Sequence, residues 1–422
     1  MHDFKYRNNE LYCESVRIED VALKFSTPLY IYSHKTLIGR YLKLKRAFAS
    51  IDPLICFSVK SSSNLSLLKA LADKGAGLDI VSGGELYRAQ KIKANPKTIV
   101  YASVGKTREE IEAAIRYGIL FFNVESLQEL GLISEAASVL KKDVRVCVRI
   151  NPNVDPHTHR YITTGTMETK FGVDFDTARI IFLNKENFKR VHILGLHVHI
   201  GSQITQVAPF LAALRRVIDL INALKKMGIR LEWLNIGGGL GIIYKEENPQ
   251  TAEQFASRIV PLLKKTGLKI ILEPGRFIVG PAGILVTRVI YVKDSSLKRF
   301  VVVDAGMNDL IRPSLYGAYH EILPVKRTEY GRRNTEYGKK SDVVGPICES
   351  GDFLAKDRDL PILAPGTFLA CMGAGAYGFS MSSNYNSRRK AAEVLVSGKK
   401  FYLIREREKL SDLVRHEKVV KL

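Results

Sequence analysis

Several side chains that can do chemistry stand at the ends of short apolar runs in this sequence. They are Lys60, Asp79, His197, His199, Gly237, Gly238, Gly239, Glu273 and Arg276. An amine, an imidazole or a carboxylate can act as a nucleophile, a proton carrier or a metal ligand, and glycines beside an arginine can hold an anion. Whether these side chains form one site depends on the elements that carry them.

Eight short β-rich runs alternate with stretches of helical periodicity, which predicts parallel β/α units. The runs are Leu54–Lys60, Gly77–Val81, Thr98–Ser103, Leu120–Glu125, Asp143–Ile150, Ile193–Ile200, Leu231–Ile236 and Lys269–Glu273. Eight units in about 220 residues favour a closed (β/α)8 barrel over an open sheet. The helix that completes the ring is predicted ahead of the first strand, over His34–Ser50.

The pattern changes after about residue 280. Predicted strands separated by Gly- and Pro-rich turns follow, over Ile284–Val292, Phe300–Val303, Val394–Val396 and Phe401–Ile404, and few helical periods accompany them. We therefore expect an α/β barrel over residues 26–280 and an antiparallel β domain over residues 281–422, joined by residues 1–25. The long gap Asn151–Phe175 is expected to be a loop over the barrel mouth.

The lysine and the two histidines each allow more than one interpretation. Lys60 is either a surface amine with its stem on apolar residues or a partly desolvated amine that attacks a carbonyl. His197 and His199 are two residues apart, so on a strand they face the same side. They could bind a metal, which would indicate a hydrolase, but the other strand ends offer no further metal ligands. A histidine stacked on a flat cofactor or bonded in the core is the alternative.

An anion site is predicted behind the last two strands of the barrel. Gly237, Gly238 and Gly239 follow the seventh run and Arg276 follows the eighth, where barrels usually bind phosphate. Glu273 either pairs with the protonated ring nitrogen of a cofactor or forms an ion pair with Arg276. A lysine, a phosphate cradle, a carboxylate and a histidine together are the contacts that pyridoxal 5'-phosphate requires.

Four motifs carry a resemblance to a known family: Phe57–Lys60, His197–Gln203, Gly237–Gly239 and Glu273–Arg276. They resemble the fold type III pyridoxal phosphate-dependent decarboxylases, and within that family the branch that acts on diaminopimelate. The resemblance runs from about Thr27 to Arg388. It implies conversion of meso-2,6-diaminopimelate to L-lysine and CO2, the final step of lysine biosynthesis.

The resemblance also implies roles for the residues of the barrel. Lys60 would bind the cofactor covalently, His199 would stack on its ring, and Glu273 would keep the ring nitrogen protonated. Asp79 would lie near the lysine. The cofactor's phosphate would be held by Ser202, Gly238, Gly239, Gly275 and Arg276.

Further roles are implied for the second domain, with Arg276 of the barrel also reaching the substrate. Arg312 and Tyr316 would bind the far end of the substrate, and Glu349 would take its ammonium group. Cys348 would donate a proton, from a segment that enters the site of a partner subunit, so a homodimer is implied. Tyr377 would touch both cofactor and substrate.

Three rival functions remain at this point. An ornithine-type decarboxylase typically has Asp in place of Glu349, and an alanine racemase needs a second base, typically Tyr, where this chain has Cys348 and Glu349. A regulator that retains the fold without the chemistry should have lost Lys60 or Cys348, and both are present.

The composition is that of a globular protein: 422 residues, 46% hydrophobic and 25% charged. The formal net charge is +21, but the basic residues are scattered, so no nucleic-acid partner is expected. No run approaches the about 18 apolar residues of a membrane span, and no secretory signal is predicted. Five cysteines without a C-x-x-C pair argue against a disulfide framework and favour a cytoplasmic location.

Overall fold

The computed structural model describes residues 2–156, 162, 164–166, 169–327 and 340–422, and the chain divides into two compact units. The barrel unit comprises residues 38–243 and 247–278. The β unit comprises residues 1–37, 244–246 and 279–422. Residues 157–161, 163, 167 and 168 of the expected loop over the mouth lie outside the described residues.

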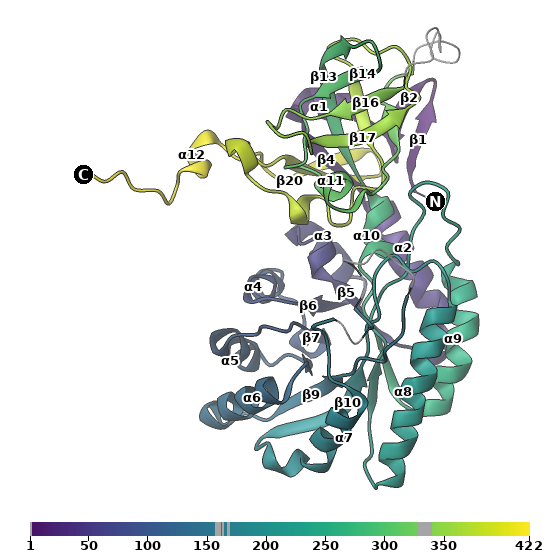
Figure 1. The fold of residues 1–422 in the computed structure, drawn as a ribbon, viewed down its shortest axis with the longest axis vertical. Coiled ribbons are helices and arrows are strands. Elements are labelled where there is room, and N and C mark those ends of the chain that lie inside the picture. The colour runs from purple at the N-terminus through teal and green to yellow at the C-terminus, as the bar shows by residue number, and fades with distance from the viewer. Residues whose placement is uncertain (1, 157–161, 163, 167–168, 328–339) are drawn as a thin grey trace. The chain divides into compact units, whose positions relative to one another are not determined.

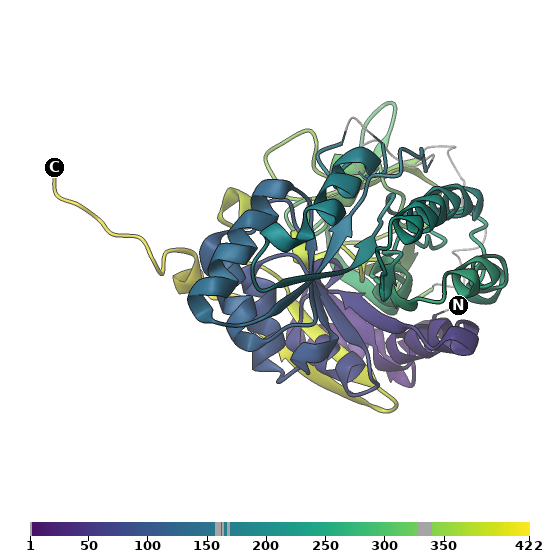
Figure 2. The same ribbon diagram turned by 90° about the horizontal axis from the view of Figure 1, so that it is seen from below.

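Eight parallel strands close into a barrel in the order β10-β11-β12-β5-β6-β7-β8-β9. The strands are β5 (Leu54–Ser58), β6 (Gly77–Ile80), β7 (Ile99–Tyr101), β8 (Phe121–Val124), β9 (Val144–Arg149), β10 (Val191–His197), β11 (Trp233–Asn235) and β12 (Lys269–Leu272). Each predicted run contains one of them or overlaps it. Figure 2 looks along this barrel, with helices placed around the strands.

Most helices of the ring begin at polar caps and bury one face. In α5, Thr107 and Glu110 form a capping box, and Ile111, Ala114 and Ile115 are buried at helical spacing. The ring helices are α2 (His34–Ala47), α3 (Leu65–Ala72), α4 (Gly83–Lys91), α5 (Arg108–Tyr117), α6 (Leu127–Leu140), α7 (Phe175–Leu183), α8 (Ala208–Lys226) and α9 (Ala252–Thr266). Figure 1 labels them.

The helix α2 completes the ring as predicted. Lys43 lies 3.5 Å from Glu253 of α9, and the rings of Phe48 and Phe255 are 5.9 Å apart. The first helix of the chain's barrel pattern therefore packs beside the last, which is the closure that a (β/α)8 ring requires.

The β unit contains two sheets. A three-stranded sheet is formed by β1 (Phe4–Arg7), β2 (Glu10–Cys13) and β3 (Val16–Arg17). The nine-stranded sheet contains β4 (Leu29–Ser33), β13 (Gly283–Asp294), β14 (Arg299–Val303), β15 (Ile322–Pro324), β16 (Ser341–Val344), β17 (Phe353–Arg358), β18 (Phe368–Cys371), β19 (Ala392–Ser397) and β20 (Lys400–Arg405). Among its described residues this unit has the short α-helices α1 (Ile18–Phe25), α11 (Arg312–Tyr316) and α12 (Leu410–Leu413), while α10 (Arg276–Val279) lies at the boundary.

Two pairings in the large sheet are parallel, β14 with β16 and β4 with β19, and the others are antiparallel. The expected barrel followed by a mostly antiparallel domain is thus confirmed. β4 lies inside the range 26–280, yet it pairs with β13 and β19 of the β unit. Its five residues are all buried, because the strand is central in that sheet.

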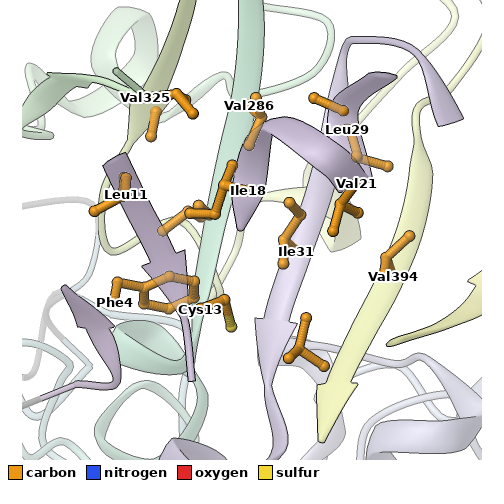
Figure 3. Close-up of a cluster of buried hydrophobic side chains, with 14 of the residues drawn as sticks. Phe4, Leu11, Cys13, Ile18, Val21, Leu29, Ile31, Val286, Val325 and Val394 are labelled. Carbon is orange, nitrogen blue, oxygen red and sulfur yellow. The ribbon is translucent and has the colours of Figure 1, made fainter. Parts of the chain in front are cut away.

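One apolar cluster joins the two sheets of the β unit (Figure 3). It combines residues from the start of the chain, such as Leu11 and Ile18, with Val286 of β13 and Val394 of β19. Residues 4–22 therefore contribute to the core of this unit, because their apolar side chains cover the apolar face of the large sheet. Among the described residues, no helix combines the length and the hydropathy that a membrane crossing requires.

Candidate functional site

The interior of the barrel changes from apolar to polar along the strands. A buried apolar layer contains Cys56, Val100, Phe121, Cys147 and Ile271, with Trp233 packed against it. Side chains on one face of a strand recur every second residue. Two residues onward from this layer along β5, β8, β9, β11 and β12, and near the ends of β6 and β10, the corresponding positions are polar: Ser58, Asn123, Arg149, Asn235, Glu273, Asp79 and His197. This polar layer lies at the carboxyl ends of the strands, where barrel enzymes carry their chemistry.

The carboxylate of Glu273 is held by three side chains. Asn123 and Asn235 donate their amide N–H groups to its Oε1, at 3.1 and 2.5 Å, and Nε2 of His197 lies 3.1 Å from its Oε2. Burial opposes ionisation, but the charge and hydrogen bonds supplied by His197 and Asn235 outweigh it and lower the pKa of Glu273 to about 2. Glu273 is therefore ionised at neutral pH.

Asp79 is a second buried carboxyl in the same layer, with the opposite tendency. Burial and the negative charge of Glu273 raise the pKa of Asp79 to about 8. Ser58 donates its hydroxyl to Oδ2 at 2.5 Å, and Oδ1 has no hydrogen-bond partner within the described residues. Nζ of Lys60 lies 4.0 Å from Oδ2. The structure therefore places Asp79 near the lysine, as the resemblance implied.

Lys60 itself follows β5 in a short 3-10 turn over Val59–Ser61. Its side chain is 39% exposed, whereas that of Asp79 is 1% exposed. The amine therefore sits at the boundary between the polar layer and solvent, where a carbonyl compound can reach it. Of the two sequence interpretations, this position favours the nucleophile.

His199 lies two residues beyond the histidine that contacts Glu273. Its Nδ1 accepts a hydrogen bond from the backbone N–H of Gly238 at 3.2 Å. Burial, followed by the positive charges of Lys60 and Arg149, lowers the pKa of His199 well below its ordinary value. His199 is therefore a neutral ring with its proton on Nε2. Among the described residues, no group of three His, Cys, Asp or Glu side chains could hold a metal ion.

The glycine loop that follows β11 lacks room for side chains. A Cβ at Gly238 would overlap the carbonyl oxygen of Glu273, and one at Gly239 would lie 2.6 Å from the carbonyl oxygen of Gly201. Gly239 also has φ of +113°, a conformation that residues with a side chain rarely adopt. The loop therefore needs glycine for close backbone packing.

A cation lies beside this loop. Nε and Nη2 of the buried Arg276 lie 3.4 and 3.2 Å from Oγ of Ser202. A Cβ at Gly275 would lie 2.9 Å from Oγ of Ser61, so the turn before Arg276 is also tightly packed. Glu273 bonds to His197, Asn123 and Asn235, and the predicted alternative of an ion pair with Arg276 is not among its contacts in the structure.

The β unit carries the remaining predicted site residues. Arg312, at the start of α11, is buried, and its Nη1 donates to Nε2 of His320 at 3.0 Å. Nδ1 of His320 donates to the carbonyl of Met372 at 2.8 Å, which fixes the tautomer that accepts from Arg312. The guanidinium carbon of Arg312 also lies 4.7 Å from the centre of the Tyr244 ring. Tyr316 ends the same helix and is half-buried.

Cys348 and Glu349 are exposed on the loop that connects β16 and β17. Backbone N–H groups of Met307 and Ile347 donate to the carboxylate of Asp352, each at 2.6 Å, and so fix the base of this loop. Tyr385 donates its hydroxyl to Glu349 at 2.7 Å. The tip of the loop therefore presents a thiol and a carboxylate on the surface of the β unit.

Tyr377, the last predicted site residue, stands in a glycine-rich segment after β18. Its φ is +57°, an unusual backbone conformation for a tyrosine. Gly375 and Gly378 on either side pack against backbone atoms of Val279 and Ala374. The surrounding packing therefore holds the strained conformation of Tyr377.

Sequence reasoning missed Asn123, Asn235 and Ser58. Each is a buried polar residue inside a predicted apolar run, which is itself a signal because such groups need a partner. Counting two residues onward from the apolar layer would have found all three. The role of His197 as a partner of Glu273 was also not predicted.

The donor set of the barrel fits a phosphorylated aromatic aldehyde. Arg276, Ser202 and the glycine loop offer positive charge and hydrogen-bond donors for a dianion. Glu273 is ionised and can pair with a protonated ring nitrogen, and Lys60 offers an amine for the aldehyde. These groups belong to one end of one barrel, which is what a single bound cofactor requires.

Comparison with known proteins supports this fit. Residues 34–280 match the family described as pyridoxal-dependent decarboxylase, pyridoxal binding domain. The chain is 48% identical to a diaminopimelate decarboxylase of Aquifex aeolicus, covering 97% of this chain and 96% of that protein. It is 44% identical to the diaminopimelate decarboxylase of Pseudomonas aeruginosa over the full length of both.

The comparison with solved structures finds the same family. Diaminopimelate decarboxylase from Helicobacter pylori, crystallised with L-lysine, is 42% identical and superposes with a TM-score of 0.90 over 94% of this chain and 98% of that chain. The resemblance inferred from four short motifs therefore extends over nearly the whole sequence. The chain belongs to the diaminopimelate decarboxylase family of pyridoxal-dependent decarboxylases.

Proposed function

We propose that this protein removes one carboxylate of meso-2,6-diaminopimelate as CO2 and releases L-lysine, with pyridoxal 5'-phosphate bound in the barrel. The observation that carries the proposal is the polar layer, in which an accessible lysine, an ionised carboxylate and a glycine–arginine anion site share one end of the barrel. The full-length similarity to diaminopimelate decarboxylases selects the substrate.

The residues of the barrel hold and orient the cofactor. Lys60 binds its aldehyde, and Ser202, Gly238, Gly239, Gly275 and Arg276 hold its phosphate. The neutral ring of His199 would contact the ring of the cofactor, and the ionised Glu273 would keep a proton on its ring nitrogen. When bound, the cofactor supplies an electron sink for the carbon that loses CO2. Because the pKa of Glu273 is about 2, its charge persists over the whole working pH range.

The residues of the β unit recognise the substrate. Its far end carries both a carboxylate and an ammonium group. Arg312, oriented by His320, binds the carboxylate together with Tyr316, and Glu349 binds the ammonium. Arg276 and Tyr377 contact the substrate near the cofactor. A substrate without the distal carboxylate supplies no anion for the buried Arg312, so the site discriminates strongly against such substrates in favour of diaminopimelate.

Cys348 carries the proton that completes the reaction. The proton passes from its Sγ to the carbon that has lost CO2, and the C–H bond replaces the C–CO2 bond. Because Cys348 and Glu349 are exposed at the tip of the loop between β16 and β17, we propose that this loop enters the site of a second copy. The working form is then a homodimer with shared sites. We propose no nucleic-acid partner on the basis of the net positive charge.

Covalent capture of the cofactor tests the proposal. Wild-type protein incubated with pyridoxal phosphate and desalted should retain a visible absorption band, and borohydride reduction should fix the cofactor on the peptide that contains Lys60. Lys60→Ala should lose both signals. A colourless wild type after incubation, or cofactor fixed on a different peptide, would refute the assignment.

A further inference from the structure

Asn235 makes two different hydrogen bonds with the two ends of its side-chain amide. Its Nδ2 donates to Oε1 of Glu273 at 2.5 Å, and its Oδ1 accepts from the backbone N–H of Gly237 at 2.9 Å. Asn235 is completely buried, so an amide left without these partners would carry the full cost of desolvation. Both bonds are therefore fixed features of the barrel mouth.

A backbone hydrogen bond joins the same two segments. The N–H of Glu273 donates to the carbonyl oxygen of Gly237 at 2.8 Å, so the end of β12 and the start of the glycine loop are tied both through the main chain and through Asn235. Gly237 has φ of +67°, and its Cβ would lie 2.6 Å from the carbonyl oxygen of Val198. The loop thus has little freedom to move without breaking the bond to Asn235.

Asn123 provides a natural comparison. Its Nδ2 donates to the same Oε1 of Glu273 at 3.1 Å, and it is also completely buried. Its backbone carbonyl accepts from Nζ of Lys106 at 2.9 Å, on the side of β8. Asn123 supports the carboxylate as Asn235 does, but within the part of the chain that the structure describes its Oδ1 has no hydrogen-bond partner, and so it makes no bond to the glycine loop.

We propose that Asn235 is a positioning residue that joins the carboxylate of Glu273 to the glycine loop, so that the contacts to the cofactor's ring nitrogen and to its phosphate are set by one side chain. The inference rests on the proposed function, because that function assigns Glu273 to the ring nitrogen and the glycine loop to the phosphate of the cofactor. The inference goes further, because it couples these two subsites through a residue that touches neither the substrate nor the reacting atoms.

The test compares two forms of the cofactor, pyridoxal phosphate and pyridoxal, which lacks the phosphate. Their dissociation constants are measured with apoprotein by quenching of Trp233, the chain's single tryptophan. The ratio of the two constants reports the phosphate site alone, and the absorption spectrum of the bound cofactor reports the ring. A general loss of folding would weaken both forms equally.

Three variants separate the two bonds. Asn123→Ala should weaken both forms by a similar factor and leave the ratio unchanged. Asn235→Ala should weaken both and also lower the preference for pyridoxal phosphate about tenfold, the scale expected for misplacing one buried polar contact. Asn235→Asp keeps an acceptor for Gly237 and replaces the amide donor to Glu273 by a second carboxyl, which must share a proton with Glu273 or repel it, so the variant should alter the spectrum and weaken both forms with the ratio retained.

The outcomes distinguish the inference from the function on which it rests. If Asn235→Ala lowers the affinity for both forms of the cofactor equally, as Asn123→Ala does, the ratio of the dissociation constants is unchanged. The inference is then overturned, and the proposed function stands. If Asn235→Ala does not fold, Asn235→Asp decides: a ratio that falls contradicts the inference, and a retained ratio with a changed spectrum supports it. Wild-type protein that fails to bind pyridoxal phosphate would overturn the proposed function itself.

Discussion

Two buried carboxyls that both interact with the charge of Lys60 are held in opposite protonation states. Glu273 has three side-chain donors and a pKa of about 2, whereas Asp79 has one hydroxyl donor and a pKa of about 8. The negative charge of the first contributes to the raised pKa of the second. Such divergence between neighbouring titratable groups is characteristic of sites that need one fixed charge and one movable proton.

The first prediction concerns Asp79 and stability. In the unfolded chain this group ionises near pH 3.8, but in the folded chain it holds its proton to about pH 8. The folded state therefore binds more protons across that interval, and the wild type loses stability as the pH rises from about 4 to about 8. At pH 7 the free energy of unfolding is lower than at pH values below about 4 by at most about 4 kcal/mol.

Asp79→Asn removes the titration and retains the shape. The apoprotein variant should gain stability over the wild type at pH 7.5, and this gain should shrink towards pH 4.5, as measured by urea unfolding at each pH. A difference in unfolding free energy that stays constant with pH, or grows towards acid, would contradict the protonation state assigned to Asp79.

The second prediction concerns the recognition of the substrate by Arg312. A buried guanidinium that loses its carboxylate partner rejects the incomplete substrate strongly, so ornithine and free lysine should be turned over at least about 1000-fold less efficiently than meso-diaminopimelate. Arg312→Met should lower kcat/KM for meso-diaminopimelate by about 100-fold or more and narrow that gap. Comparable turnover of ornithine and meso-diaminopimelate by the wild type would show that Arg312 does not select the substrate.

At the scale of elements, the barrel was predictable because its signal is local. Each strand is a short apolar run and each helix a periodic one, so strand order and the closing position of α2 followed from spacing. Only part of the inward polar layer could be recognised from the sequence. Lys60, Glu273 and the glycine loop stand at the ends of the predicted runs, whereas Asn123 and Asn235 stand inside the runs Leu120–Glu125 and Leu231–Ile236 and look like interruptions.

The β unit was less accessible to sequence reasoning for a physical reason. Its strands pair over long separations: β4 near residue 30 pairs with β13 and β19, and Leu11 packs near Val286 and Val394 in one core. A five-residue apolar run contains no signal about which distant strand it joins. The loop of Cys348 could be placed only through the family resemblance, because an exposed cysteine has no periodicity.

The third prediction tests the glycine loop. Gly238→Ala places a Cβ against the carbonyl oxygen of Glu273, and because that atom is backbone the loop or β12 must shift. Affinity for pyridoxal phosphate should fall at least about tenfold, and the melting temperature should drop by several degrees. Gly105→Ala, in the loop after β7, is the control because nothing lies within 4 Å of its Cβ position. Equal behaviour of the two variants would refute the packing argument.

At the scale of the whole molecule, the proposed roles fall on residues of both units of the chain. We propose that the barrel unit supplies the cofactor contacts and that the β unit supplies Arg312, Tyr316, Cys348, Glu349 and Tyr377. Two arginines, Arg276 and Arg312, are assigned to a dianionic cofactor and a dicarboxylate. They account for a small part of the +21 charge, and the rest has no structural explanation in the chain.

The fourth prediction tests sharing between subunits. Lys60→Ala and Cys348→Ala should each be inactive alone. After subunit exchange at equal concentrations, half of the dimers are hybrids with one intact site, so activity should recover to about a quarter of the wild type. No recovery despite exchange verified by native mass spectrometry would contradict a site built from two chains.

The most direct test of the account is the release of lysine from meso-diaminopimelate by the purified protein with pyridoxal phosphate. The account predicts L-lysine and CO2 in equal amounts, a dependence on added cofactor, and no product with Lys60→Ala. If the wild type binds pyridoxal phosphate on Lys60 but forms no lysine from meso-diaminopimelate, the barrel holds its cofactor for a different reaction and the central claim fails.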